Sequence, residues 1–348
     1  MKINNVLTKL ESKIALCVES GFDDIKLTEL GLCREFGVSR TTVRKAVQEL
    51  KARGLLSARK GSGLFIRNKE INSRGLLRNT FIPFILCNRQ WSDPRCLTAM
   101  MSLETAFQEK GMVFFPRTIN APLKNVSQLV DYFVPGKTLF ALVAGDIMDD
   151  FIFSDPGKSA PHFILYGYSP PNPYHSVVCA DIEAGCNRIL HCLDSREKVA
   201  LLNGIRHLWI HKKVLTCFER YVHDRKLRAG DYAIAHSAIE YGYGEALKII
   251  EKLGKSVGII TANNVLAMAV YQVAAALGLK IPSQVGVVSI GETDVANSLT
   301  PGLTTLGLNE NEMAHRTVEY IMQYLRTSGV KKNSRIVIQP EIITRHST

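Results

Sequence analysis

Apolar residues recur at helical spacing in the first part of the chain. In residues 6–18 they return every three or four positions and predict an amphipathic helix that ends near Gly21. Residues 27–36 predict a second, shorter helix, which Gly37 ends. Ser39 is a good N-cap for a third helix. The pattern therefore predicts a helix, a tight turn and a further helix.

The third predicted helix has one apolar face and one basic face, and Gly54 is a good stop for it. The polar face carries Arg40, Thr41, Arg44, Lys45 and Gln48. Such donors on the exposed half of a helix-turn-helix reach phosphates and base edges in a major groove. Two short strands, 55–57 and 64–66, follow with a basic, glycine-rich connection that predicts a wing.

The rest of the chain alternates apolar strand-like runs with helical segments. The predicted strands are 81–87, 113–115, 139–144 and 162–166, followed by 199–202, 233–235, 257–260 and 285–290. The predicted helices are 97–110, 126–133, 182–193, 213–227, 245–253 and 265–277. Buried strands alternating with helices indicate parallel sheets covered on both faces, and two sets of them indicate two lobes. The fold class is α/β, with a ligand cleft expected between the lobes.

Composition and charge indicate what kind of partner the first domain binds. The 348 residues are 46% hydrophobic and 22% charged, which is typical of a globular chain of two or three domains. Residues 1–78 contain 16 Lys and Arg against 8 Asp and Glu, whereas the other 270 residues contain 27 against 24. This basic start favours a domain that binds a polyanion, although a solvated basic face is the plain alternative.

Other classes of protein find little support. No apolar run approaches the roughly 18 residues of a membrane span, and the start of the chain lacks the apolar core of a signal peptide, so a cytoplasmic location is expected. The eight cysteines form no Cys-x-x-Cys pair and are expected to be buried thiols. His207 and His211 lack the acid of a metalloprotease motif. We expect no enzyme activity, no metal and no cofactor.

The segment Phe36-Gly37-Val38-Ser39-Arg40-Thr41-Thr42-Val43-Arg44-Lys45-Ala46 resembles the DNA-binding domain of the GntR family of bacterial transcription regulators, over about residues 5–68. The resemblance implies a winged helix-turn-helix that binds operator DNA. The residues expected to contact DNA are Arg40, Thr41, Thr42, Arg44 and Lys45, with Lys60, Gly61, Ser62 and Gly63 in the wing. The family usually has an arginine near Leu30, so its usual operator consensus is not assumed.

The later segments 261–264, 285–291, 299–305 and 345–348 look like the effector domain of the lactose-repressor family, which is similar to periplasmic sugar-binding proteins. The combination is similar to arabinose repressors. The domains expected are a winged helix-turn-helix at 1–68, a polar linker at 69–79, and a two-lobed effector-binding and dimerisation domain at 80–348.

Ligand contacts follow from this resemblance only in part. Asp181 and Asn263 match a carboxylate and an amide that bind sugar hydroxyls in the family, and both suit that chemistry. Lys212 stands where an arginine is frequent, and Glu292 is a substitute for a missing aspartate. Trp91 and Asp93 follow the first strand of the first lobe and are expected to line the cleft. Each also has a structural interpretation, as a core residue, a helix cap or a surface charge.

Together these features predict a homodimeric repressor of carbohydrate-use genes. Its partners are double-stranded operator DNA and a small effector, a mono- or small oligosaccharide, that releases the DNA. One alternative is a non-sugar effector, such as a nucleobase or a phosphorylated metabolite. Another is a cytosolic sugar-binding or sugar-modifying protein whose winged helix contacts a protein partner.

Overall fold

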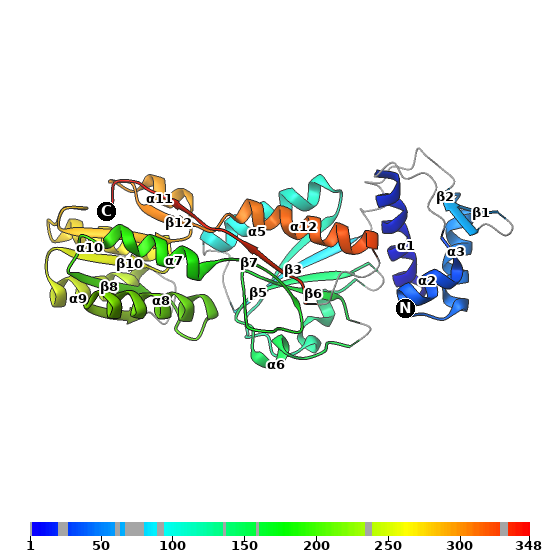
Figure 1. The fold of residues 1–348 in the computed structure, drawn as a ribbon, viewed down its shortest axis with the longest axis horizontal. Coiled ribbons are helices and arrows are strands. Elements are labelled where there is room, and N and C mark those ends of the chain that lie inside the picture. The colour runs from blue at the N-terminus through cyan, green and yellow to red at the C-terminus, as the bar shows by residue number, and fades with distance from the viewer. Residues whose placement is uncertain are drawn as a thin grey trace.

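The computed structural model describes residues 2–19, 27–59, 63–66, 80–88, 94–134, 137–157, 160–233, 239–327 and 333–348. These form three bodies in a row, with the N-terminal helices at one end and the second α/β lobe at the other (Figure 1). The linker predicted at 69–79 lies outside the described residues. The α/β fold class, with a winged helix and two lobes of parallel sheet, is confirmed.

The first body is a winged helix made of α1(Lys2–Glu19), α2(Glu29–Phe36), α3(Arg40–Ala52), β1(Leu56–Arg59) and β2(Gly63–Ile66). The Thr28 side chain caps α2 by accepting a hydrogen bond from the backbone of Gly31, and Gly37 ends α2 in the left-handed conformation. β1 and β2 pair antiparallel, and the backbone of Leu27 bridges to Leu64. Apolar side chains of all three helices form its core.

The first lobe has one sheet in the order β13-β7-β6-β5-β3-β4, with every pair parallel, and its first strand in this order is β13(Arg335–Ile338). Its elements are β3(Phe81–Cys87), α5(Pro94–Glu109), β4(Val113–Ile119), the 3-10 helix η1(Val126–Tyr132), β5(Phe140–Gly145), α6(Asp149–Ile152), β6(His162–Tyr166) and β7(Ser176–Ala180). Its central strands are buried, as their continuous apolar runs predict.

The second lobe has a sheet in the order β14-β12-β11-β10-β8-β9, in which β14 is antiparallel. Its elements are α7(Ile182–Leu190), the 3-10 helix η2(His191–Leu193), β8(Lys198–Asn203), α8(Trp209–Arg225), β9(Arg228–Ala233), α9(Ile239–Leu253), β10(Val257–Thr261), α10(Asn264–Ala276), β11(Val285–Ile290), α11(Asp294–Ser298), β12(Thr304–Gly307) and β14(Glu341–Ile343). The strand predicted at 233–235 lies earlier, at 228–233. Its sequence, Arg-Ala-Gly-Asp-Tyr-Ala, is too polar to stand out as an apolar run.

The chain passes between the lobes three times. It leaves the first lobe after β7, returns from β12 into α12(Glu310–Thr327), and crosses again from β13(Arg335–Ile338) to β14. The carboxyl ends of the parallel strands of both sheets therefore face the junction, where ligands of open parallel sheets bind.

The winged helix packs against the first lobe through α1. Residues of α1 contact α12, and the Ser12 Oγ and Thr80 Oγ1 atoms lie 3.4 Å apart in a buried hydrogen bond. Figure 1 shows α1 beside the end of α12. Among the described segments, none of the helices combines the length and the apolar character that crossing a membrane requires.

Candidate functional site

The polar face of α3 begins at a capped helix end. The Ser39 hydroxyl accepts a hydrogen bond from the backbone N–H of Thr42 at 3.3 Å, and the two hydroxyls lie 2.9 Å apart. Arg40 and Arg44 follow one turn apart, and both side chains are exposed. This arrangement places two guanidinium groups at the N-terminal end of the helix, where a helix-turn-helix meets base edges and phosphates.

A carboxylate from α2 holds both arginines. Glu29 Oε2 lies 3.2 Å from Arg40 Nε and 3.4 Å from an Nη atom of Arg44. Partial burial raises the pKa of Glu29, but the hydrogen bonds and charges of Arg44 and Arg40 outweigh that effect and keep the pKa below its usual value. The carboxyl is therefore ionised at neutral pH and fixes the spacing of the two arginines.

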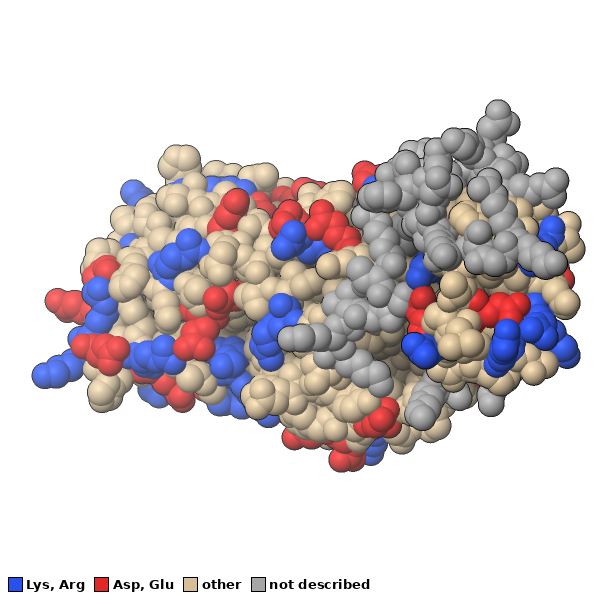
Figure 2. Space-filling model, turned by 45° about the vertical axis from the view of Figure 1, so that its right-hand side comes forward, with Lys and Arg blue, Asp and Glu red and all other residues tan. Residues whose placement is uncertain are grey.

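The structure brings five of the predicted DNA contacts together on α3: Arg40, Thr41, Thr42, Arg44 and Lys45. Gly63 begins β2 in the wing, with φ +101°, while Lys60, Gly61 and Ser62 lie outside the described residues. Figure 2 shows Lys and Arg side chains next to Asp and Glu side chains at the end of the molecule that the winged helix forms.

A second candidate site lies where the lobes meet. A cavity of about 110 Å³, open to solvent, is lined by the ends of β3, β5 and β6, the first turn of α5, the start of α8, and Leu308 and Glu310. The rings of Tyr168 and Trp209, one from each lobe, have centroids 5.5 Å apart. Burial, with the charges of Asp149 and Asp146, raises the pKa of Tyr168 to about 12, so its hydroxyl stays protonated at neutral pH.

One polar contact also joins the lobes beside these rings. His207 Nε2, from the loop after β8, lies 3.0 Å from Asp146 Oδ2, at the end of β5. Asn88 Nδ2 donates to the same oxygen at 3.0 Å. The Asp146 side chain is 7% exposed and that of His207 is 60% exposed. A carboxylate, an amide and an imidazole thus meet at one oxygen atom, next in sequence to the cavity-lining residues Gly145 and Leu208 but not themselves among the residues that line the cavity.

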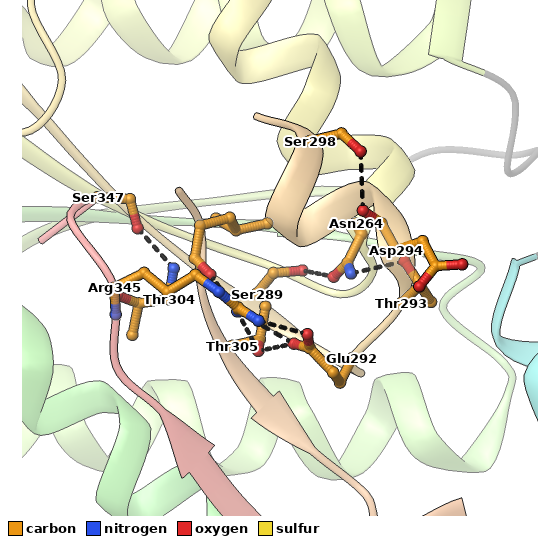
Figure 3. Close-up of polar contacts among 11 residues, drawn as sticks. Asn264, Ser289, Glu292, Thr293, Asp294, Ser298, Thr304, Thr305, Arg345 and Ser347 are labelled. Carbon is orange, nitrogen blue, oxygen red and sulfur yellow. Dashed lines mark hydrogen bonds and ion pairs between the residues drawn. The ribbon is translucent and has the colours of Figure 1, made fainter. Parts of the chain in front are cut away.

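Two predicted ligand contacts serve as helix caps. Asp181 Oδ1 accepts a hydrogen bond from the backbone of Ala184 at the start of α7, and Asn263 Oδ1 accepts one from Leu266 at the start of α10. Both residues stand at carboxyl ends of strands, as expected, but these oxygens point back to the backbone. Neighbouring Asn264 bonds Ser289 and Thr293 instead (Figure 3).

The other predicted ligand contacts are spread out. Glu292 pairs with Arg345, at 2.6 Å between Oε1 and an Nη atom, and accepts a hydrogen bond from Thr305 (Figure 3). Lys212 is exposed in the first turn of α8. Trp91 and Asp93 lie outside the described residues. The structure therefore does not gather the predicted set around one point, and these contacts remain predictions.

Four residues at the junction of the lobes are absent from the predicted ligand contacts: Asp146, Tyr168, His207 and Trp209. Each follows the end of a strand or begins the next helix, and that position is the signal that could have found them. Trp209 begins α8, four residues before the helix predicted at 213–227.

The described residues offer little to a metal ion. In the part of the chain that the structure covers, no three His, Cys, Asp or Glu side chains gather closely enough to hold one. His191, Asp194 and Arg225 form an ion-pair network on the surface of the second lobe instead.

Comparison with known proteins agrees with this geometry. Residues 24–66 match the family described as bacterial regulatory proteins, gntR family, and residues 181–348 match the periplasmic binding protein-like domain. An arabinose metabolism transcriptional repressor of Halalkalibacterium halodurans is 22% identical over 100% of this chain and 96% of its own length.

Two further matches are partial. The HTH-type transcriptional regulator DegA of Bacillus subtilis is 27% identical over 51% of this chain and 53% of its own length, so this match spans about half of that relative. A periplasmic binding protein/LacI transcriptional regulator from Alkaliphilus metalliredigens, solved with D-xylulofuranose, shares the fold, with a TM-score of 0.65 and 15% identity over 76% of this chain and 98% of that one.

The two curated relatives named above are transcription regulators rather than enzymes. The chain thus joins a DNA-binding domain of the gntR family of bacterial regulatory proteins to a periplasmic binding protein-like domain, and it is a transcription regulator.

Proposed function

We propose that the protein is a homodimeric repressor of carbohydrate-use genes, released from its operator by a sugar bound between the lobes. Residues 1–68 form the DNA-binding domain, 69–79 the linker and 80–348 the effector domain. The observation that carries the proposal is the cleft, where an aromatic pair and a polar cluster from opposite lobes meet. The relation to arabinose repressors supports a sugar.

The chemistry of the cleft suits a sugar. Aromatic rings such as Trp209 and Tyr168 pack against the apolar C–H face of a pyranose or furanose. The Asp146 carboxylate accepts hydrogen bonds from hydroxyl groups, and the Asn88 amide both donates and accepts them. A sugar that enters this point replaces the contact between Asp146 and His207 with contacts of its own. Sugar binding thereby changes the orientation of the two lobes relative to each other.

The winged helix, at the other end of the molecule, binds DNA in this proposal. Arg40 and Arg44 contact bases or phosphates, with Thr41, Thr42, Lys45 and the wing residues Lys60 to Gly63 beside them. Two winged helices of a dimer read the two halves of a palindrome, because a two-fold protein matches a two-fold site.

A second candidate effector is a flat, weakly polar molecule such as a nucleobase. The cavity walls favour it, because Phe84, Leu86, Leu208 and Ile210 line them next to the aromatic pair. Such a ligand would stack on the rings of Tyr168 and Trp209, and its polar edge would form hydrogen bonds with Asp146 and Asn88.

Fluorescence anisotropy on the DNA upstream of its own gene tests the proposal. The full chain is titrated at low and moderate salt, with and without a pool of pentoses and hexoses and, separately, a pool of nucleobases. We expect salt-sensitive binding that the sugar pool relieves, since neutralised phosphates make affinity fall with salt. If only the nucleobase pool lowered DNA binding, the effector would be a nucleobase and not a sugar. Sequence preference no better than for random DNA in a genome-wide selection would favour a protein partner.

A further inference from the structure

Leu30 is an exposed apolar side chain on a charged surface. Among the winged-helix residues that the structure describes, it is the one large apolar side chain that is exposed, with 52% of its surface accessible. It stands in the first turn of α2, while Leu32, two residues further, is fully packed into the core. A single exposed leucine is common on protein surfaces, so it is the position of Leu30, rather than its exposure alone, that points to a partner.

The neighbours of Leu30 identify that partner. Glu29, the preceding residue, contacts Arg40 and Arg44, so the first turn of α2 lies against the N-terminal half of α3. This half of α3 carries the donors proposed to read the major groove. A side chain that projects outward from the first turn of α2 therefore lies at the edge of the same surface.

Leucine has no hydrogen-bond donor or acceptor, so it reads the groove by apolar contact alone. The major groove offers one apolar group that differs between base pairs, the C5-methyl group of thymine. We infer that Leu30 contacts a thymine methyl in each half of the operator and selects a thymine at that position. This inference rests on the proposed DNA binding and adds a specificity-determining residue to it.

Deoxyuridine tests the contact, because it differs from thymidine only by this methyl group. An operator is first selected from random DNA with the full wild-type chain. Each thymine of one half-site is then replaced singly by deoxyuridine, and affinity is measured by anisotropy. At one position we expect an affinity loss of about fourfold, which corresponds to one buried methyl group.

The Leu30→Ala variant links this loss to the side chain. We expect it to bind the thymine and deoxyuridine duplexes equally, whereas Leu30→Met, which keeps an apolar chain, remains sensitive. Leu277→Ala is the matched control, because Leu277 is 47% exposed but lies in the second lobe, where it should leave the sensitivity unchanged. Circular dichroism checks that each variant is folded.

Two results would overturn the inference while DNA binding stands. One is an operator in which no thymine is sensitive to loss of its methyl group. The other is a Leu30→Ala variant that keeps the full wild-type sensitivity. Failure of the wild-type chain to select any sequence is a different result, because it removes the proposed DNA binding itself.

Discussion

At the scale of single residues, charge governs how the winged helix is prepared for DNA. Glu29 carries a full negative charge at neutral pH between two arginines that face outward. The carboxylate holds both guanidinium groups in place, and it also repels phosphates. We therefore expect Glu29 to lower the affinity for DNA in general and to raise the discrimination among sequences.

Replacing Glu29 by Gln separates these effects. We expect Glu29→Gln to bind random DNA more tightly, because a negative charge is lost, and to prefer the operator less, because Arg40 and Arg44 lose their common partner. Anisotropy on operator and scrambled duplexes over a salt series measures both. Glu104→Gln, which removes the same charge from α5, is the control. An unchanged ratio of the two affinities would rule out the positioning role.

Lys9 carries its charge in a partly buried position, at the contact between α1 and the first lobe. It lines a cavity of about 180 Å³ there, and its ammonium lies 5.8 Å from the ring centre of Phe36. Burial lowers the pKa of Lys9, and Glu35 only partly offsets this effect. The unfolded chain therefore holds this proton more tightly than the folded chain, and its charge costs stability at neutral pH.

We expect Lys9→Met to be more stable than the wild type near neutral pH. The difference should shrink as the pH rises through the lowered pKa, because the folded wild type then loses the unfavourable charge. Thermal unfolding at about pH 7 and about pH 10 measures this. Lys110→Met, at an exposed position, should show no such trend. A Lys9→Met variant that is less stable at every pH would contradict the burial argument.

At the scale of elements, the first turn of α10 raises the question of whether Asn263 caps the helix, binds a ligand or does both. Asn263 is 4% exposed, and its oxygen bonds the helix backbone 2.9 Å away. Asn263→Ala should cost about 1 kcal/mol of unfolding free energy, whereas Asn263→Ser should keep most of it, because serine caps helices well. Urea unfolding compares the two. A stable Asn263→Ser variant that no longer responds to effector would give the amide a ligand role as well.

Elements with a strong local signal were predictable from the sequence. The capped α3 and the buried strands β3, β5 and β11 were all expected within a few residues of where they lie. Their signal is carried within the element, by a cap or by a continuous apolar run. The cationic face of α3 follows from the same periodicity.

Elements that depend on distant partners were missed. β13 and β14 have four and three residues, and each is defined by pairing with a strand far away in the sequence. In α12, Met313, Ile321 and Leu325 do recur at multiples of four, so this helix had a signal that was not used. The candidate ligand site could not be predicted for the same reason, because the contact between Asp146 and His207 depends on how the two lobes meet. No local pattern encodes that.

At the scale of the whole molecule, regulation requires that two lobes and a winged helix respond to one another. The contact between Asp146 Oδ2 and His207 Nε2, 3.0 Å apart, joins side chains of the two lobes directly. We expect Asp146→Asn to weaken lobe closure on the sugar and to lower effector affinity two- to fivefold, because the carboxylate proposed to accept sugar hydroxyls is lost and a hydrogen bond contributes about 1 kcal/mol. Small-angle scattering and effector titration measure these changes. Glu183→Gln breaks an ion pair with Arg220 on the surface of the second lobe, and should change neither.

Coupling between effector and operator must act in both directions. If a sugar weakens operator binding by some factor, operator DNA must weaken sugar binding by the same factor, typically 5- to 150-fold. Titration calorimetry of the sugar with free and operator-bound protein measures the second factor. Equal sugar affinity in both states would show that the sugar is not the inducer.

The three passages of the chain between the lobes constrain the order of events during synthesis. The sheet of the first lobe includes β13 at residues 335–338, so this lobe stays incomplete until that strand has left the ribosome. The helices and strands that the structure describes in the winged helix all lie within residues 2–66. A nascent chain therefore presents its DNA-reading surface well before it has a finished sensor. We expect freshly made protein to pass through a stage in which the proposed DNA contacts are possible without a sensor to regulate them. The duration of this stage depends on the speed of translation.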